Sequence, residues 1–276
     1  MRAPLATMAA RRPTDVPAIE LTGLSKRFQT AEGTVQAIER VTFAVASGDF
    51  VCLVGPSGCG KSTLLNIIAG LLPASAGEVR ICGEPGGSVR PDRIGYVFQR
   101  DALLPWKTAL QNVMLPLLLR GVPPAESRET ARHWVHKVGL AGFEHHYPSQ
   151  LSGGMRKRIA LAMTMVYRPS IILMDEPFAA LDVQTRNLME NELLALWAET
   201  GSAILFVTHD LEEAIALADR IVVLTAAPAR VRCEYPVPLE RPRDVAEIRT
   251  TSAFLDIYRH IWRDLREEVA ASHGRR

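Results

Sequence analysis

A glycine-rich stretch near residue 55 combines residue types that favour the binding of phosphate groups. GPSGCGKST at 55–63 fits the pattern G-x-x-x-x-G-K-[ST] and lies between an apolar run and a helix-forming run. Glycines let backbone N–H groups approach an anion, the lysine reaches the β- and γ-phosphates, and the next hydroxyl is a ligand for Mg²⁺. The pattern predicts a site for ATP and Mg²⁺, with Ser62 as a metal ligand. The predicted nucleotide-binding residues here are Gly55, Pro56, Ser57, Gly58, Cys59, Gly60, Lys61, Ser62 and Thr63.

Two adjacent carboxylates follow another apolar run, IILM at 171–174. Asp175 is predicted to hold Mg²⁺, as the aspartate at the end of such a strand does in P-loop enzymes. Glu176 has two interpretations. It is a general base for the water that attacks the γ-phosphate, a role that typically gives about 10² to 10⁴ in rate, or it caps a helix opened by Pro177.

A second glycine pair occurs in LSGGMRKR at 151–158, where it opens an apolar helix pattern. A hydroxyl, two glycines and a helix N-terminus together favour an anion, so Ser152, Gly153 and Gly154 are candidates for a second phosphate contact. The alternative is a structural one, in which the serine is an ordinary N-cap and the glycines form a tight loop.

Strands alternate with helices along the chain, which predicts an α/β fold with a mostly parallel sheet covered on both faces. Helical periodicity dominates from about 101 to 166 and indicates an inserted helical subdomain. A proline-marked extended stretch and an amphipathic helix follow residue 226. The short apolar runs that predict buried strands are DFVCLVG (49–55), SIILMD (170–175), SAILFVTH (202–209) and RIVVLT (220–225).

Composition excludes several classes of protein. The 276 residues carry 32 Lys and Arg against 30 Asp and Glu, a formal charge of +2, so we expect no nucleic-acid partner. No apolar run approaches the roughly 18 residues of a membrane-spanning helix. The first sixteen residues lack the apolar core of a signal sequence and are predicted to be a disordered leader.

The cysteines show neither a CxxC pair nor metal-ligand spacing, which is typical of a protein in a reducing cytoplasm. The chain has 4 of them: Cys52, Cys59, Cys82 and Cys233. Cys59 lies inside the phosphate-binding pattern, where it is either a small filler residue or a redox-sensitive thiol.

Five motifs together resemble the ATP-binding subunit of an ABC transporter, and their order and spacing hold over residues 17–225. They are GPSGCGKST at 55–63, LSGGMRKR at 151–158, MDEP at 174–177, ALD at 180–182 and TH at 208–209. The resemblance implies a RecA-like P-loop NTPase core with an inserted α-helical subdomain and an N-terminal antiparallel β region. Residues 17–225 would form the ATP-binding domain, and residues 226–276 a C-terminal extension.

The same resemblance implies a head-to-tail pair of subunits in which the signature loop of one covers ATP bound to the other. Ser152, Gly153 and Gly154 would then bind the partner's nucleotide. Phe28 matches the aromatic residue that stacks on adenine, although a core role is its alternative. Asp182 matches the residue that communicates between the two sites.

Three further residues are assigned to hydrolysis by the resemblance. Gln99 would reach Mg²⁺ and the attacking water, Glu176 would be the general base, and His209 would hydrogen-bond the γ-phosphate. A histidine that follows a strand is more often structural, which remains the alternative for His209. We therefore expect an ATPase.

Two stretches of the chain resemble those of the ATP-binding subunits of importers for nitrate, taurine and aliphatic sulfonates. They are RDALLPWKTALQNVMLPLLLRG and DEPFAALD. Such a subunit would bind integral-membrane permease subunits from the cytoplasmic face of the inner membrane and serve, indirectly, an extracytoplasmic solute-binding protein. The alternative is a nonhydrolytic or non-transport ATP switch of the same type.

Lys157 departs from the family pattern, which more often has glutamine at position 155 or 157. The ammonium either alters the charge near the partner's phosphate or faces solvent. Lys157→Gln is expected to change ATP turnover modestly, as measured by steady-state ATPase activity, and a total loss of activity would contradict this interpretation.

Overall fold

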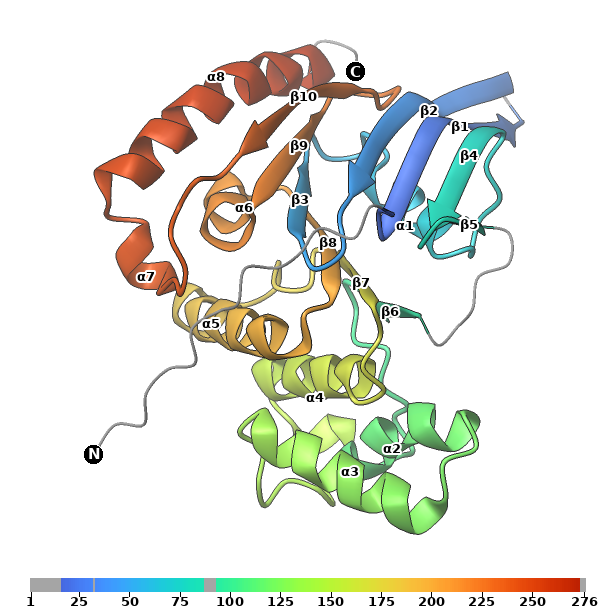
Figure 1. Cartoon of the computed structure of the whole chain (residues 1–276), viewed down its shortest axis with the longest axis vertical. Helices are drawn as coiled ribbons and strands as arrows, with labels where there is room; N and C mark the ends of the chain where they lie inside the picture. The colour runs from blue at the N-terminus through green and yellow to red at the C-terminus, as the bar shows by residue number, and fades with distance from the viewer. Residues whose placement is uncertain (1–15, 32, 87–92, 274–276) are drawn as a thin grey trace.

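The computed structural model describes residues 16–31, 33–86 and 93–273 (Figure 1). The predicted leader therefore lies outside the described residues, apart from Val16. The strands are β1 (Ile19–Thr30), β2 (Gly33–Val45), β3 (Phe50–Val54), β4 (Ala76–Ile81), β5 (Glu84–Pro85), β6 (Ile94–Val97), β7 (Ile171–Asp175), β8 (Ala203–Thr208), β9 (Arg220–Leu224) and β10 (Val231–Pro236). The helices are α1 (Lys61–Ile68), α2 (Ala109–Leu119), α3 (Pro124–Lys137), the 3₁₀ turn η2 (Pro148–Gln150), α4 (Gly153–Met165), α5 (Val183–Thr200), α6 (Leu211–Leu217), α7 (Val245–Ile248) and α8 (Ser252–His273).

A six-stranded sheet forms the centre of the molecule, in the order β10-β9-β3-β8-β7-β6. The five strands from β9 to β6 pair in parallel. All of β3 and β8 is buried, as expected of strands covered on both faces. The predicted α/β fold with a mostly parallel sheet is confirmed.

A second, four-stranded sheet has the order β2-β1-β4-β5 and is antiparallel, which confirms the predicted N-terminal β region. Its inner face packs with α1 and with one face of the central sheet in a shared apolar core. Leu21, Ile38 and Leu65 lie in this core with 0–1% exposure. The start of α1 is thereby held between the two sheets.

The helices α2, α3 and α4 pack on one another beyond the β6 edge (Figure 1). Trp134 and Ile159 fill their interface, and Thr108 and Gln111 form a capping box at the start of α2. The expectation of helical structure throughout 101–166 was too broad, because residues 139–147 form turns. Gly139 and Gly142 adopt positive φ there, which ends α3 and keeps the chain out of a helix.

The C-terminal region joins the central sheet. β10 pairs antiparallel with β9, so the proline-marked stretch supplies an edge strand that its sequence predicted only as extended. Helix α8 packs on α6 with Phe254, Ile261 and Leu265 buried. None of the helices in the described ranges is both long enough and apolar enough to cross a bilayer.

A buried charged network connects α5, α6 and α7. Glu190 is fully buried and accepts a hydrogen bond from Arg249 at 3.0 Å, while Arg186 pairs with Asp210 at 3.2 Å. Burial raises the pKa of Glu190 to about 7 and that of Glu213 to about 8. Glu213 is therefore protonated in the folded protein at neutral pH.

The raised pKa of Glu213 makes stability depend on pH. Its ordinary pKa of 4.5 in the unfolded chain lies below the folded value of about 8, so stability is lost as pH rises through that window. Glu213→Gln is expected to flatten the fall in unfolding free energy between about pH 5 and pH 8, measured by urea denaturation. Parallel curves for the variant and the unchanged protein would contradict this expectation.

Candidate functional site

The glycine-rich loop at 55–60 connects β3 to α1, the position that its sequence predicted. Gly60 is the N-cap of α1 with φ of 117°, a conformation that side chains with a Cβ rarely adopt. An added Cβ there would also lie 3.1 Å from the carbonyl oxygen of Ala37. The loop thus keeps its backbone close to the helix N-terminus, where N–H groups attract an anion.

Lys61 is the first residue of α1 and is only 5% exposed. Its ammonium donates to the carbonyl oxygens of Gly55 at 2.8 Å and Pro56 at 3.0 Å. The cation therefore lies within the curve of the loop, in reach of any phosphate bound there. Cys59 is a buried member of the loop, and burial raises the pKa of its thiol, which opposes redox chemistry.

Ser62 and Asp175 meet across the site, with the serine hydroxyl donating to Oδ1 of Asp175 at 2.9 Å. Partial burial raises the pKa of Asp175, and the Ser62 hydroxyl opposes that rise. The described residues contain no cluster of three or more His, Cys, Asp or Glu suited to a metal. A hydroxyl and one carboxylate still fit Mg²⁺, which takes its other ligands from phosphates and water.

Gln99, Glu176 and His209 come together although they are far apart in the sequence. Oε2 of Glu176 lies 3.0 Å from Nδ1 of His209 and 3.4 Å from the amide nitrogen of Gln99. Glu176 has φ of 43°, uncommon for a residue with a side chain, and its N–H donates to the carbonyl of Val207. The structure does not use Glu176 as an N-cap of α5, because Asp182 has that role.

The signature residues lie on a different element. Ser152 is the exposed N-cap of α4, and its Oγ accepts a hydrogen bond from the N–H of Met155 at 3.3 Å. A Cβ on Gly154 would lie 3.0 Å from the Thr185 methyl group, which places this loop beside the start of α5. Helix α4 contacts α2, α3, β6 and α5, whereas α1 lies next to the smaller sheet (Figure 1).

Asp182 and Phe28 lie on different elements from the predicted site residues described above. Asp182 caps α5 by accepting from the N–H of Thr185 at 3.0 Å, and this bond lowers the pKa of its carboxyl. Phe28 lies on β1, opposite Val35, and is 36% exposed. The ammonium of Lys26 lies 5.0 Å from the centre of the Phe28 ring.

Lys157 does not face solvent, which corrects that sequence interpretation, whereas its effect on the charge near the partner's phosphate stays a prediction. It is 6% exposed, and its ammonium donates to the carbonyl oxygen of Gln99 at 2.6 Å. Sequence analysis also missed Asp101, which pairs with Lys157 and Arg156. The available signal was an aspartate two residues after Gln99 and a run of three cations, Arg156, Lys157 and Arg158, in the signature.

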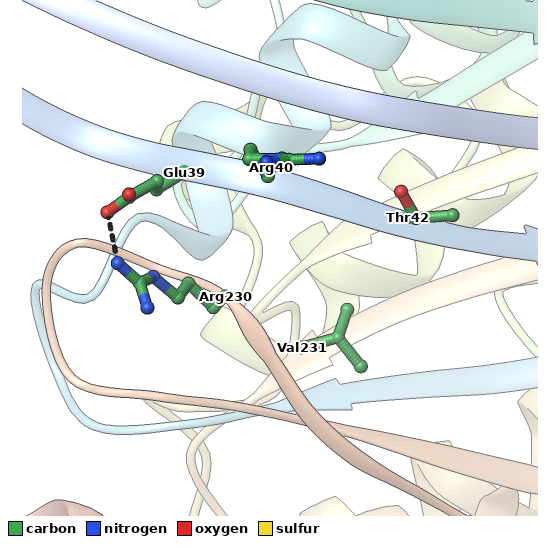
Figure 2. A pocket seen from close by; sticks show the side chains of 5 residues that line it. All are labelled: Glu39, Arg40, Thr42, Arg230 and Val231. Atoms are coloured by element: carbon green, nitrogen blue, oxygen red, sulfur yellow. Dashed lines mark ion pairs between the residues drawn. The ribbon is translucent and has the colours of Figure 1, made fainter.

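A surface hollow elsewhere contains none of the predicted site residues. Figure 2 shows it between β2 and the chain that enters β10, with Glu39 and Arg230 paired at 2.8 Å. A smaller cavity is lined in part by Glu176, His209 and Glu213. Two of the predicted site residues, Glu176 and His209, thus line the second hollow, and none lines the first.

The parallel sheet and its strand-to-helix phosphate loop define a RecA-like P-loop NTPase core. Residues 38–179 match the family described as ABC transporter. The nitrate import ATP-binding protein of Synechococcus elongatus is 42% identical over 224 residues, covering 80% of this chain and 81% of the relative. The taurine import ATP-binding protein of Yersinia pestis is 46% identical over 195 residues, covering 71% and 76%.

A solved dimeric ATP-binding cassette, bound to ADP and Pi in a post-hydrolysis state, is also similar to this chain. It has a TM-score of 0.72 and 34% identity, and the match covers 80% of this chain and 100% of that one. The chain belongs to the ABC transporter family of ATP-binding subunits, in the group that includes nitrate and taurine importers.

The predicted adenine contact is tested at Phe28. Phe28→Ala is expected to raise the Kd for ATP roughly tenfold, because base stacking on an aromatic ring is worth about 1–3 kcal/mol. Phe28→Tyr keeps the ring and is expected to keep the affinity. Isothermal titration measures both, with Phe143→Ala as a control because Phe143 has similar exposure, 37%, in the helical region. An unchanged Kd for Phe28→Ala would contradict the adenine contact and favour a structural role for Phe28.

Proposed function

We propose that this protein hydrolyses ATP and thereby energises an ABC importer for nitrate, taurine, an aliphatic sulfonate or a related small solute. The observation that carries the enzymatic part is the meeting of Gln99, Glu176 and His209 beside the Ser62–Asp175 pair. Gln99, Glu176 and His209 lie just beyond the carboxyl ends of the neighbouring parallel strands β6, β7 and β8, the usual position of ligand sites in such sheets.

In the proposed reaction the N–H groups of the phosphate loop and Lys61 bind the β- and γ-phosphates. Ser62, Asp175 and Gln99 would hold Mg²⁺, which neutralises charge on the phosphate oxygens when bound. Glu176 accepts a proton from the water whose oxygen attacks the γ-phosphorus, and the bond to the β-phosphate oxygen breaks to give ADP and phosphate. His209 hydrogen-bonds the γ-phosphate and orients Glu176 through the 3.0 Å contact.

The proposed working unit is a head-to-tail pair of subunits. Ser152 and Gly153 are exposed at the N-terminus of α4, so their hydroxyl and N–H groups are accessible to a nucleotide held by the partner. A similar cassette forms a dimer with ADP and Pi bound, which supports this arrangement. Asp182, beside the signature loop, would transmit the state of one site to the other.

The proposed membrane partner is a pair of permease subunits that bind the helical region. Trp106 and Leu119 are 70% and 77% exposed there, and burying apolar surface of this kind favours association. The nitrate and taurine importers among the relatives support import. The subunit would act at the cytoplasmic face of the inner membrane, with a solute-binding protein on the other side.

Glu176→Gln separates hydrolysis from binding. The amide keeps the size of the side chain but cannot accept the proton, so kcat is expected to fall by about 10² to 10⁴. ATP binding is expected to persist, and the nucleotide-bound dimer to accumulate on size-exclusion chromatography. Phosphate release and a fluorescent ATP analogue measure the two properties.

Unchanged turnover in Glu176→Gln would contradict the role of Glu176 as general base. Absence of ATP hydrolysis in the unmodified protein would favour the nonhydrolytic switch. The transport part is tested separately by purifying the tagged subunit from membranes. Copurification of a permease supports it, whereas recovery of the subunit without any membrane protein would contradict it.

A further inference from the structure

Lys157 is a buried cation in the second turn of α4. Its ammonium donates to the carbonyl of Gln99 at 2.6 Å and lies 3.1 Å from Oδ1 of Asp101. The second contact is an ion pair rather than a well-aligned hydrogen bond. A buried ammonium is unfavourable unless it is paired and hydrogen-bonded, and both compensating groups come from the segment after β6. The segment after β6 that contains Gln99 and Asp101 is therefore attached to α4.

Arg156 strengthens the same attachment. Its Nε donates to Oδ2 of Asp101 at 2.9 Å, and its Nη1 donates to the carbonyl of Leu151 at 2.8 Å. Asp101, with its side chain 18% exposed, thus lies between two consecutive cations of one helix. Removing one member of such a network leaves another charge uncompensated, so the contacts hold the segment strongly in one place.

Gln99 connects this attachment to the reacting groups. Its carbonyl accepts from Lys157, while its side-chain amide lies 3.4 Å from Glu176. Ser152 caps the helix that carries Lys157, and its exposed hydroxyl would face the partner's nucleotide in the proposed dimer. A continuous set of contacts therefore extends from the signature loop to the general base.

We propose that Lys157, together with Asp101, is a positioning residue that fixes Gln99 against Glu176 and couples the signature helix to hydrolysis. The inference rests on the proposed ATPase function and adds a determinant that lies outside the reacting groups.

The chemistry of position 157 predicts a graded series. An ammonium supplies both a donor for the Gln99 carbonyl and a charge for Asp101, whereas glutamine supplies only the donor. Methionine, similar in length, supplies neither. The ability to hold Gln99 is therefore expected to fall in the order Lys, Gln, Met.

Steady-state kinetics test the series. Lys157→Met is expected to lower kcat about tenfold or more while the KM for ATP stays within about twofold, because misplaced catalytic groups affect the transition state. Lys157→Gln is expected to lower kcat only about two- to fivefold. The control is Arg158→Met, which removes an ion pair with Glu192 and a bond to the Val138 carbonyl from the same helix. Its kcat is expected to stay unchanged.

Combining Lys157→Met with a substitution of Gln99 tests whether Lys157 acts through Gln99. In Gln99→Ala protein, addition of Lys157→Met is expected to change kcat by less than about twofold, because the two substitutions remove the same effect. Independent, multiplicative losses would overturn the assignment. Unchanged kcat in Lys157→Met alone would do the same.

Hydrogen exchange without nucleotide tests the attachment even if the protein hydrolyses no ATP. Amides in residues 98–103 are expected to exchange faster in Lys157→Met than in the unmodified protein and in Arg158→Met. Equal rates would overturn the inference and leave the proposed function intact, whereas absent hydrolysis with faster exchange would refute only the proposed function. If Lys157→Met does not fold, kcat and hydrogen exchange are measured on Lys157→Gln instead. Exchange in residues 98–103 no faster in Lys157→Gln than in the unmodified protein would then overturn the inference.

Discussion

The register of three parallel strands determines where Gln99, Glu176 and His209 meet. Val97 on β6 pairs with Met174 on β7, which pairs in turn with Phe206 on β8. Gln99 and Glu176 each lie two residues beyond this level and His209 three, so their side chains emerge at one edge of the sheet. A shift of one residue would turn each side chain to the opposite face. The strands are apolar and buried, which opposes such a shift.

The site joins the central sheet to the helical region. The phosphate loop is held between two sheets, and Glu176 is anchored to β8 through its N–H bond to Val207. Gln99 belongs to the segment that leaves the central sheet for the helical region, where Lys157 of α4 donates a hydrogen bond to its carbonyl oxygen. The same residue thus contacts Glu176 through its side chain and the helical region through its backbone.

Much of this arrangement could be predicted from local sequence. The phosphate loop, the aspartate at the end of β7 and the parallel character of the sheet depend on short patterns of apolar and glycine residues. The meeting of Gln99, Glu176 and His209 followed only from the family resemblance. The burial of Lys157 and the pairing of β10 were not predictable, since both depend on contacts with distant segments that no local pattern encodes. The turns at 139–147 were hidden by the apolar residues on either side.

Ser152 uses one oxygen for two purposes. Its lone pair accepts the Met155 N–H, which completes the first turn of α4, while its own hydrogen remains available to donate. Aspartate would cap the helix equally well, yet it would present a repelling charge to a phosphate and no proton to share. Stability of the helix alone therefore permits several side chains at this position, and the proposed contact with the partner's nucleotide would narrow the choice to a neutral group that both accepts and donates.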